Sequence, residues 1–180
     1  MELLHLLNYD LSWHDRERWD RAIHLMERFF AEQREELAPV AEKARIVKFG
    51  IDEVDAFIQR NTAVVCPHCT NVCCINKHGY YDFEDLIYIF SLGINPLKYK
   101  EGVLDTDSCQ FISECGCTIE RAVRPFRCNW HFCNALIVHI EEGPAKPYRA
   151  FEKRLQGVMD LRSEMLHEFF TILRLKTERC

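Results

Sequence analysis

Residues 66–74 of the sequence read CPHCTNVCC, which places four cysteines within nine residues and makes the last two, Cys73 and Cys74, adjacent. Neighbouring side chains point in different directions on any regular backbone, because a helix turns by about 100° per residue and a strand alternates its faces. Cys73 and Cys74 are therefore poorly placed to act as ordinary ligands of one tetrahedral ion. The pair indicates either more than one metal atom, or one ligand next to a spare thiol.

The cysteines are concentrated in the middle of the chain. Residues 1–65 contain none and residues 134–180 contain only Cys180, so nine of the ten lie between positions 66 and 133. Five of these nine form a second run: Cys109, Cys115, Cys117, Cys128 and Cys133. Soft thiolates select zinc, copper(I) or iron–sulfur clusters over magnesium or calcium. Short spacings such as that of Cys66 and Cys69 occur in zinc sites and in iron–sulfur sites alike, so spacing leaves both open.

The number of thiols narrows the choice. One structural zinc ion takes four ligands, which leaves most of the nine central cysteines unexplained. Two four-ligand sites would leave one cysteine over, as would a polynuclear centre with extra or bridging thiolates. A four-iron cluster also takes four cysteines, and its spare thiols could be redox partners. The surplus favours more than a single zinc ion.

The composition is that of a globular chain and predicts one domain, residues 1–180, with 48% hydrophobic and 28% charged residues. A net charge of −5 without a Lys/Arg run argues against a nucleic-acid partner. The first residues, MELLHLLNYD, lack the basic region and cleavage site of a signal peptide. No stretch approaches the roughly 20 apolar residues of a membrane span. We therefore expect a cytoplasmic protein without a membrane partner, in which cysteines bind metal rather than form disulfides.

Helical patterns flank the cysteines on both sides. Ser12 and Asp15 predict a capping box at the start of the first helix. Its apolar stripe comprises Trp19, Ile23, Met26, Phe30 and Leu37. Pro39 predicts the end or a break of that helix, and a shorter helix is expected over residues 51–60.

A long helix is also predicted after Pro147, near the end of the chain. Its apolar stripe comprises Phe151, Leu155, Val158, Met159, Met165, Leu166, Phe169 and Leu173. Residues 82–93 predict a compact helix between the cysteine runs, capped by Asp82 and ended by Gly93. The pattern favours a mainly α fold, in which terminal helices (1–61 and 134–180) form a bundle that flanks an irregular metal-binding centre (62–133). We expect the two stripes to pack together within a monomer or across a homodimer.

The cysteine pattern resembles the family of cysteine-cluster proteins with the signature CxxCxxCC, which is described as a zinc- or iron-chelating domain. The first run looks like this signature, although residues 70–72 place three positions where the family usually has two. Residues 109–112, CQFI, and residues 117–128, CTIERAVRPFRC, are similar to the family's later motifs, which end in R-P-x-x-C. The likeness covers about residues 62–133.

The resemblance implies a set of metal ligands and a single unit that contains both runs. The ligands that it implies are Cys66, Cys69, Cys73, Cys74, Cys109, Cys117 and Cys128. Cys115 and Cys133 are additional to the family's pattern and are candidates by proximity alone, and His131 could replace a cysteine. Because the likeness spans both runs, we expect them to meet in space. Arg124 and Arg127 could offset thiolate charge.

Three functions follow from these observations. The first is a redox or metal-handling role around an iron–sulfur cluster or zinc, and the second is a structural zinc in a protein–protein interaction module. The third is a part in a methyl-transfer system, because related cysteine clusters occur in flagellin lysine methylases. No nucleotide-binding glycine motif or catalytic triad pattern is present in the sequence, so whether the protein is an enzyme is left open and no catalytic residue is assigned.

Overall fold

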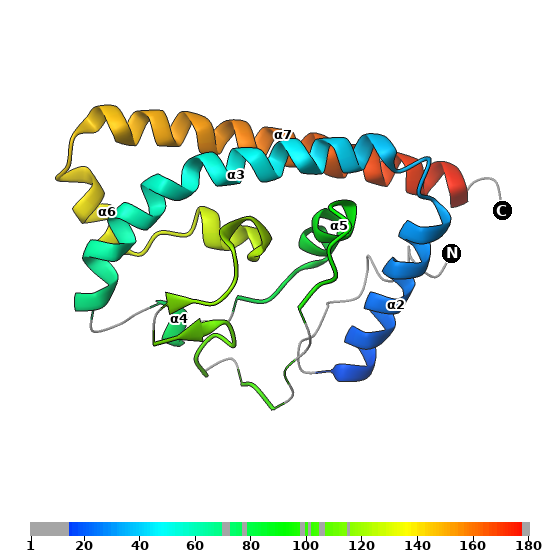
Figure 1. Ribbon diagram of the computed structural model, residues 1–180, viewed down its shortest axis with the longest axis horizontal. Coiled ribbons are helices and arrows are strands. Elements are labelled where there is room, and N and C mark those ends of the chain that lie inside the picture. The colour runs from blue at the N-terminus through cyan, green and yellow to red at the C-terminus, as the bar shows by residue number, and fades with distance from the viewer. Residues whose placement is uncertain are drawn as a thin grey trace. The chain divides into compact units, whose positions relative to one another are not determined.

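The computed structural model describes residues 15–69, 73–76, 79–97, 100, 102–104, 107–114 and 116–177. The prediction of a mainly α fold is confirmed, because long helices make up most of the described chain and its sheet has two short strands (Figure 1). The chain divides into two compact units. Unit 1 comprises the described residues of Met1–Ile46, Tyr80–Val103 and Leu161–Cys180, and unit 2 those of Val47–Gly79 and Leu104–Asp160. The expectation of a single domain stays a prediction.

Helix α2 (Arg16–Glu32) opens unit 1. Asp15 is its N-cap, since its carboxylate accepts a hydrogen bond from the backbone N–H of Arg18 at 3.0 Å. The predicted cap Ser12 lies outside the described residues. The buried side chains of α2 are Trp19, Ala22, Leu25 and Met26. The apolar stripe is therefore confirmed at Trp19 and Met26, while Ile23 is only half-buried.

Helix α3 (Ala38–Val65) corrects the prediction of a short helix over residues 51–60. Pro39 predicts the end or a break of the first helix, and the helical pattern does break just before it, between Glu32 and Ala38. Pro39 itself lies in the first turn of α3, where the backbone N–H has no helical partner and proline is tolerated. The buried side chains of α3 recur every three or four residues: Val40, Ala44, Val47, Ile51, Val54 and Ile58. This period keeps one face of the helix apolar along its 28 residues.

The core of unit 1 combines α2 and α5 (Phe83–Ser91) with the last part of α7 (Ala145–Thr177). The ring of Phe169 in α7 is fully buried and lies 5.8 Å from the ring of Phe29 and 5.7 Å from that of Phe30, both in α2. This confirms within unit 1 that the first and last apolar stripes pack together. Arg162 donates hydrogen bonds to Glu84 at 2.7 Å and to Asp85 at 3.2 Å, which fixes α5 to α7.

Helix α5 forms where the sequence predicts it. Asp82 and Asp85 make a reciprocal capping box, and Gly93 has a φ of 71°, which a glycine adopts without steric cost.

The helical core of unit 2 joins the second part of α3 to the first part of α7. The rings of Phe57 and Phe151 stack with centroids 4.4 Å apart, and the ring of Phe132 also stacks on Phe151, at 5.6 Å. Gly50 allows the two helices to approach closely, because a Cβ at this position would lie 2.6 Å from a methyl group of Val158. Met159, predicted in the apolar stripe of α7, is 41% exposed.

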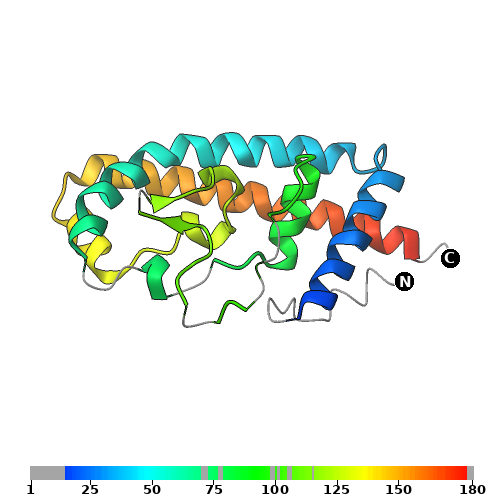
Figure 2. The ribbon, with the colours of Figure 1, turned by 60° about the horizontal axis from the view of Figure 1, so that its bottom comes forward.

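The eight cysteines that the structure describes lie on or next to short elements of unit 2. These are the 3₁₀ turn η1 (Cys66–His68), α4 (Cys73–Asn76), the antiparallel strands β1 (Ile112–Ser113) and β2 (Gly116–Cys117), the 3₁₀ turns η2 (Arg121–Val123) and η3 (Phe126–Asn129), and the start of α6 (Asn134–Glu141). Figure 2 shows these short elements from a second direction. Among the described residues, no helix is both long and apolar enough to cross a membrane.

Candidate metal centre

The first cysteine run begins where α3 ends. Cys66 starts η1, and the backbone N–H of Cys69 donates to the carbonyl of Cys66 at 3.2 Å, so both thiols belong to one tight turn. Cys73 and Cys74 are consecutive residues of α4. Because a helix turns about 100° per residue, their side chains leave α4 in different directions.

The second run returns to the first one through a backbone hydrogen bond. The N–H of Cys109 donates to the carbonyl of Cys74 at 2.7 Å, which confirms the expectation that the two runs meet in space. The chain then turns through β1 and β2, where Cys117 pairs with Ile112. The N–H of Ile112 donates in turn to the carbonyl of Cys109 at 2.9 Å. These backbone hydrogen bonds connect α4 to Cys109, and Cys109 to the hairpin whose second strand carries Cys117.

Three thiols lie near that of Cys74, and we refer to Cys74, Cys109, Cys117 and Cys128 as the Cys74 quartet. Burial, together with the neighbouring thiols of Cys74, Cys109 and Cys117, raises the pKa of Cys128 to about 12. Burial also raises the pKa of Cys74, followed by the effect of Cys109 and Cys117. The sulfurs of Cys109 and Cys128 both lie 3.6 Å from the point that a Cβ of residue 79 would occupy. Gly79 thus leaves room between them.

The other four described cysteines form a second neighbourhood, the Cys73 quartet of Cys66, Cys69, Cys73 and Cys133. Burial is the main cause that raises the pKa of Cys73 to about 11, and the nearby thiol of Cys133 adds to this rise. Burial raises the pKa of Cys66, and the thiols of Cys133 and then Cys69 add to this shift in pKa. Cys133, which is additional to the family's pattern, is therefore a full member of this group.

The adjacent pair is divided between the two quartets. The thiol of Cys133 adds to the rise in the pKa of Cys73, whereas those of Cys109 and Cys117 add to the rise in the pKa of Cys74. Cys66 also raises the pKa of Cys74, and Cys74 that of Cys73, so the two quartets are neighbours.

Two arginines, Arg121 and Arg124, lie near members of the Cys74 quartet. Burial raises the pKa of Cys74 and of Cys128, and the positive charge of Arg124 opposes this rise in both. Arg121 is buried; it donates to the carbonyl of Cys128 at 3.2 Å and to the carboxylate of Asp55 on α3. The Asp55–Arg121 pair therefore attaches the backbone at Cys128 to the helical core of unit 2.

Two predicted ligands are not placed in either quartet. Cys115 lies outside the described residues. The side chain of His131 is exposed, and its ring lies edge to face with Trp130 at 6.2 Å. The sequence analysis also missed positions that shape the site, namely Gly79, Arg121 and Asp55. For Gly79, the available signal was a glycine five residues after Cys74. The ion pair of Asp55 and Arg121 joins residues 66 positions apart, so no local sequence pattern indicates it.

Thiols are the donors that a thiophilic metal prefers, but no three of the described thiols are arranged around one point where an ion could bind. Among the residues that the structure describes, no three or more Cys, His, Asp or Glu side chains are arranged so that they could hold a metal ion as they stand. Metal binding therefore requires the thiols of a quartet to move closer together. The buried Nε2 of Gln110 and both side-chain polar atoms of Asn129 have no hydrogen-bond partner among the described residues, and each residue is next in the chain to a member of the Cys74 quartet. Anionic sulfur accepts hydrogen bonds from such amide groups around metal centres.

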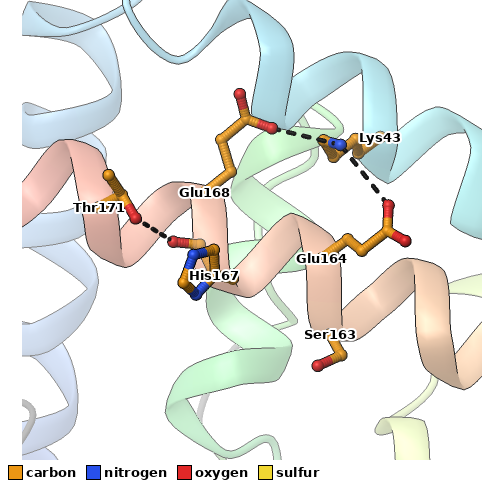
Figure 3. Close-up of a pocket in the computed structure, with 6 residues that line it drawn as sticks. All are labelled: Lys43, Ser163, Glu164, His167, Glu168 and Thr171. Atoms are coloured by element: carbon orange, nitrogen blue, oxygen red, sulfur yellow. Dashed lines mark hydrogen bonds and ion pairs between the residues drawn. The ribbon is translucent and has the colours of Figure 1, made fainter.

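Unit 1 contains an open hollow of about 550 Å³, shown in Figure 3. It is lined by Lys43, Ser163, Glu164, His167, Glu168 and Thr171. The ammonium group of Lys43 lies 3.7 Å from the carboxylate of Glu164 and 3.5 Å from that of Glu168. The lysine and the two glutamates that line this hollow are therefore ion-paired with one another. We assign it no ligand.

Comparisons of this chain with protein-family models, with curated proteins and with solved structures find no match. The resemblance to the CxxCxxCC family rests on the motifs quoted above and stays a prediction.

Proposed function

We propose that this protein binds metal through its clustered cysteines, as an iron–sulfur cluster or as zinc, and that it has a redox or metal-handling role. The observation that carries the proposal is the meeting of the two cysteine runs in unit 2. Cys74 and Cys109 are 35 positions apart, yet a backbone hydrogen bond of 2.7 Å joins them, and the thiol of Cys133 lies close enough to Cys73 to raise the pKa of Cys73. Thiols from separate segments that converge in this way are the donors that zinc and iron–sulfur clusters use.

Four of the clustered thiols have a raised pKa in the metal-free fold. Burial raises the pKa of Cys66, Cys73, Cys74 and Cys128, so these groups keep their protons well above pH 7. A thiophilic metal binds the thiolate, and binding therefore releases these protons. Affinity is expected to rise with pH through the neutral range.

A structural role for zinc is the second candidate, and the poor apolar core of the cysteine segments favours it. In the described residues of 66–79 and 104–133, the buried hydrophobic side chains are Phe111 and Ala122. So little apolar burial contributes little free energy of folding to these segments. Metal–thiolate bonds supply such folding energy in small metal domains.

The test is the colour and elemental content of the full-length protein after anaerobic purification. A brown protein with broad absorption near about 400 nm and with iron and acid-labile sulfide would establish the iron–sulfur form. A colourless protein with stoichiometric zinc would establish the structural form. Absence of iron, zinc and copper from both the aerobic and the anaerobic preparation would overturn the proposal.

A further inference from the structure

We propose that the metal-free fold contains a two-coordinate site for copper(I), in which the thiolates of Cys109 and Cys128 bind the ion beside Gly79. The proposal rests on the proposed function in that these thiols are metal donors. It goes further, because it names copper(I), its two ligands and the residue whose lack of a side chain leaves room for the ion.

Gly79 is buried where three chain segments meet, next to the sulfurs of Cys109 and Cys128. A Cβ on residue 79 would lie 3.6 Å from each sulfur and 3.5 Å from Cγ of Pro125, and these are its three nearest atoms beyond the local backbone. Such distances are ordinary van der Waals contacts, so the three side chains border a space the size of a methyl group. A small ion fits there once both thiols turn toward it, since metal–thiolate bonds measure about 2.3 Å.

Backbone hydrogen bonds fix the segments that carry the two thiols. The N–H of Cys109 donates to the carbonyl of Cys74 at 2.7 Å, and the N–H of Cys128 donates to the carbonyl of Pro125 at 2.9 Å. The buried Arg121 donates to the carbonyl of Cys128 at 3.2 Å. Because the backbone is held at both cysteines, the two sulfurs approach one point before any metal binds, and binding orders few further atoms.

The number of donors and the charge favour copper(I) at this point. Zinc takes four ligands, and no three or more described donors are arranged to hold an ion, whereas copper(I) is a soft ion that two thiolates can hold. Two thiolates around a monovalent ion leave a single negative charge. The positive charge of Arg124 acts on Cys128, and its Nε donates to the carbonyl of Ile119 at 2.9 Å, which fixes the guanidinium. This one arginine therefore balances the charge of the loaded site.

Unpaired polar atoms in the residues that follow the two thiols are a second, independent observation. Asn129, which follows Cys128, is fully buried, and neither its Nδ2 nor its Oδ1 has a hydrogen-bond partner in the described part of the chain. The buried Nε2 of Gln110, which follows Cys109, is also unpaired in that part. Buried polar atoms without a partner cost free energy, and they occur where a fold holds an ion, a ligand or water. Thiolate sulfur accepts hydrogen bonds from such amide groups.

The test uses the full-length protein, stripped of metal and titrated with copper(I) under anaerobic conditions with ascorbate as the reductant. Bicinchoninate, a chromophoric copper(I) chelator, competes for the ion, and the titration reports the first and tightest equivalent. Each thiol releases its proton as it binds. Gly79→Ala keeps every thiol and puts a methyl group where the ion binds. Its affinity for the first equivalent should fall by more than about tenfold, and Cys109→Ser and Cys128→Ser should lose that equivalent.

Gly157→Ala is the matched control, because it adds the same methyl group to unit 2 where no described atom beyond the local backbone lies within 4 Å of the new Cβ. It should bind the first equivalent as the parent does. Neither glycine has a positive φ, and the new Cβ at residue 79 makes only ordinary contacts. The urea midpoint of metal-free Gly79→Ala should therefore be no lower than that of the parent. A loss of binding without a loss of stability distinguishes a residue of the site from a residue that only packs.

A second readout uses the parent chain alone and so does not depend on the folding of a variant. After one equivalent of copper(I) has bound, the free thiols are alkylated and mass spectrometry locates the protected ones. These should be Cys109 and Cys128. X-ray absorption at the copper edge of the same sample should show about two sulfur neighbours.

The outcomes separate this inference from the proposed function. Equal affinities of the parent and Gly79→Ala for the first equivalent, protection of another pair of thiols, or a copper shell of three or more sulfurs would overturn the inference. Each leaves the proposed function standing, because the iron or zinc content of the purified protein is a separate measurement. If Gly79→Ala does not fold, the two readouts on the parent decide. Failure of the parent to bind copper(I) also overturns the inference, and together with absence of iron and zinc from the purified protein it overturns both.

Discussion

The ion pair between Arg121 and Asp55 is the structural connection between the cysteine segments and the helical core of unit 2, and Asp55→Ala tests it. The Arg121 side chain is 6% exposed, whereas that of Asp55 is 37% exposed. Removal of the carboxylate leaves a buried guanidinium whose remaining described acceptor is the carbonyl of Cys128, at 3.2 Å. A hydrogen bond to a charged group contributes about 1.5–3 kcal/mol. The full cost of a broken buried pair, about 3–5 kcal/mol, is not expected because water reaches Asp55.

A matched control is available one helical turn earlier. Asp52 pairs with Lys48 at 2.8 Å on the exposed surface of the same helix, where such a pair contributes about 0.3–0.5 kcal/mol. Asp→Ala also raises helix propensity, and this gain is common to both positions because both lie inside α3. Asp55→Ala should therefore lower the free energy of unfolding by about 1–2.5 kcal/mol more than Asp52→Ala does.

The assay is equilibrium urea denaturation of the full-length chain, followed by far-UV circular dichroism under reducing conditions, with and without bound metal. The midpoint of each variant is compared with the parent at a constant m-value. Equal losses for Asp55→Ala and Asp52→Ala would refute the claim that the Asp55–Arg121 pair holds the cysteine segments to α3. A larger loss at Asp52 would do the same.

Three further predictions address packing and protonation. Gly50→Ala places a Cβ 2.6 Å from the Val158 methyl, so overpacking of about 1–3 kcal/mol should outweigh the helix-propensity gain of about 1 kcal/mol. In a Val158→Ala background the same change should become stabilising in urea denaturation, and stabilisation in the parent as well would contradict the close approach. Phe169→Ala removes a fully buried ring from unit 1 and should cost about 3–5 kcal/mol, while metal content per folded chain stays unchanged because the quartets lie in unit 2. Burial raises the pKa of Cys73 to about 11 and that of Cys128 to about 12, whereas unfolded thiols titrate near about 8.5. Above that pH the unfolded chain loses protons that the folded chain retains, so the urea midpoint of the metal-free protein should fall steadily from about pH 8.5 toward 11, and a flat or rising midpoint would argue against buried neutral thiols.

The elements that could be predicted are those whose signals are local. The capping box of Asp82 and Asp85 and the glycine after α5 are both readable within a few residues. The sequence does not predict the full length of α3, because a proline such as Pro39 is typical of a helix end as well as of a first helical turn. The turn that precedes Ala38 in the structure shows that Pro39 lies in the first turn of a new helix.

The candidate metal ligands illustrate the same limit. The cysteine-rich centre is recognisable from composition and spacing, but Cys109 and Cys133, which are neighbours of Cys74 and Cys73, approach from distant parts of the chain. Sequence spacing could state that two sites would use eight cysteines, but could not state which four belong together. Cys133 was ranked as an accessory candidate because it is additional to the family's pattern, and tertiary contact alone joins it to Cys73.

X-ray absorption at the metal edge of the anaerobically purified, full-length protein tests the central claim most directly, because it reports the atoms bonded to the metal in the native chain. We predict a first shell of sulfur alone, with about four scatterers at about 2.3 Å, as thiolate ligation requires. A shell that contains nitrogen or oxygen donors at about 2.0–2.1 Å, or a chain that carries no transition metal, would contradict the account.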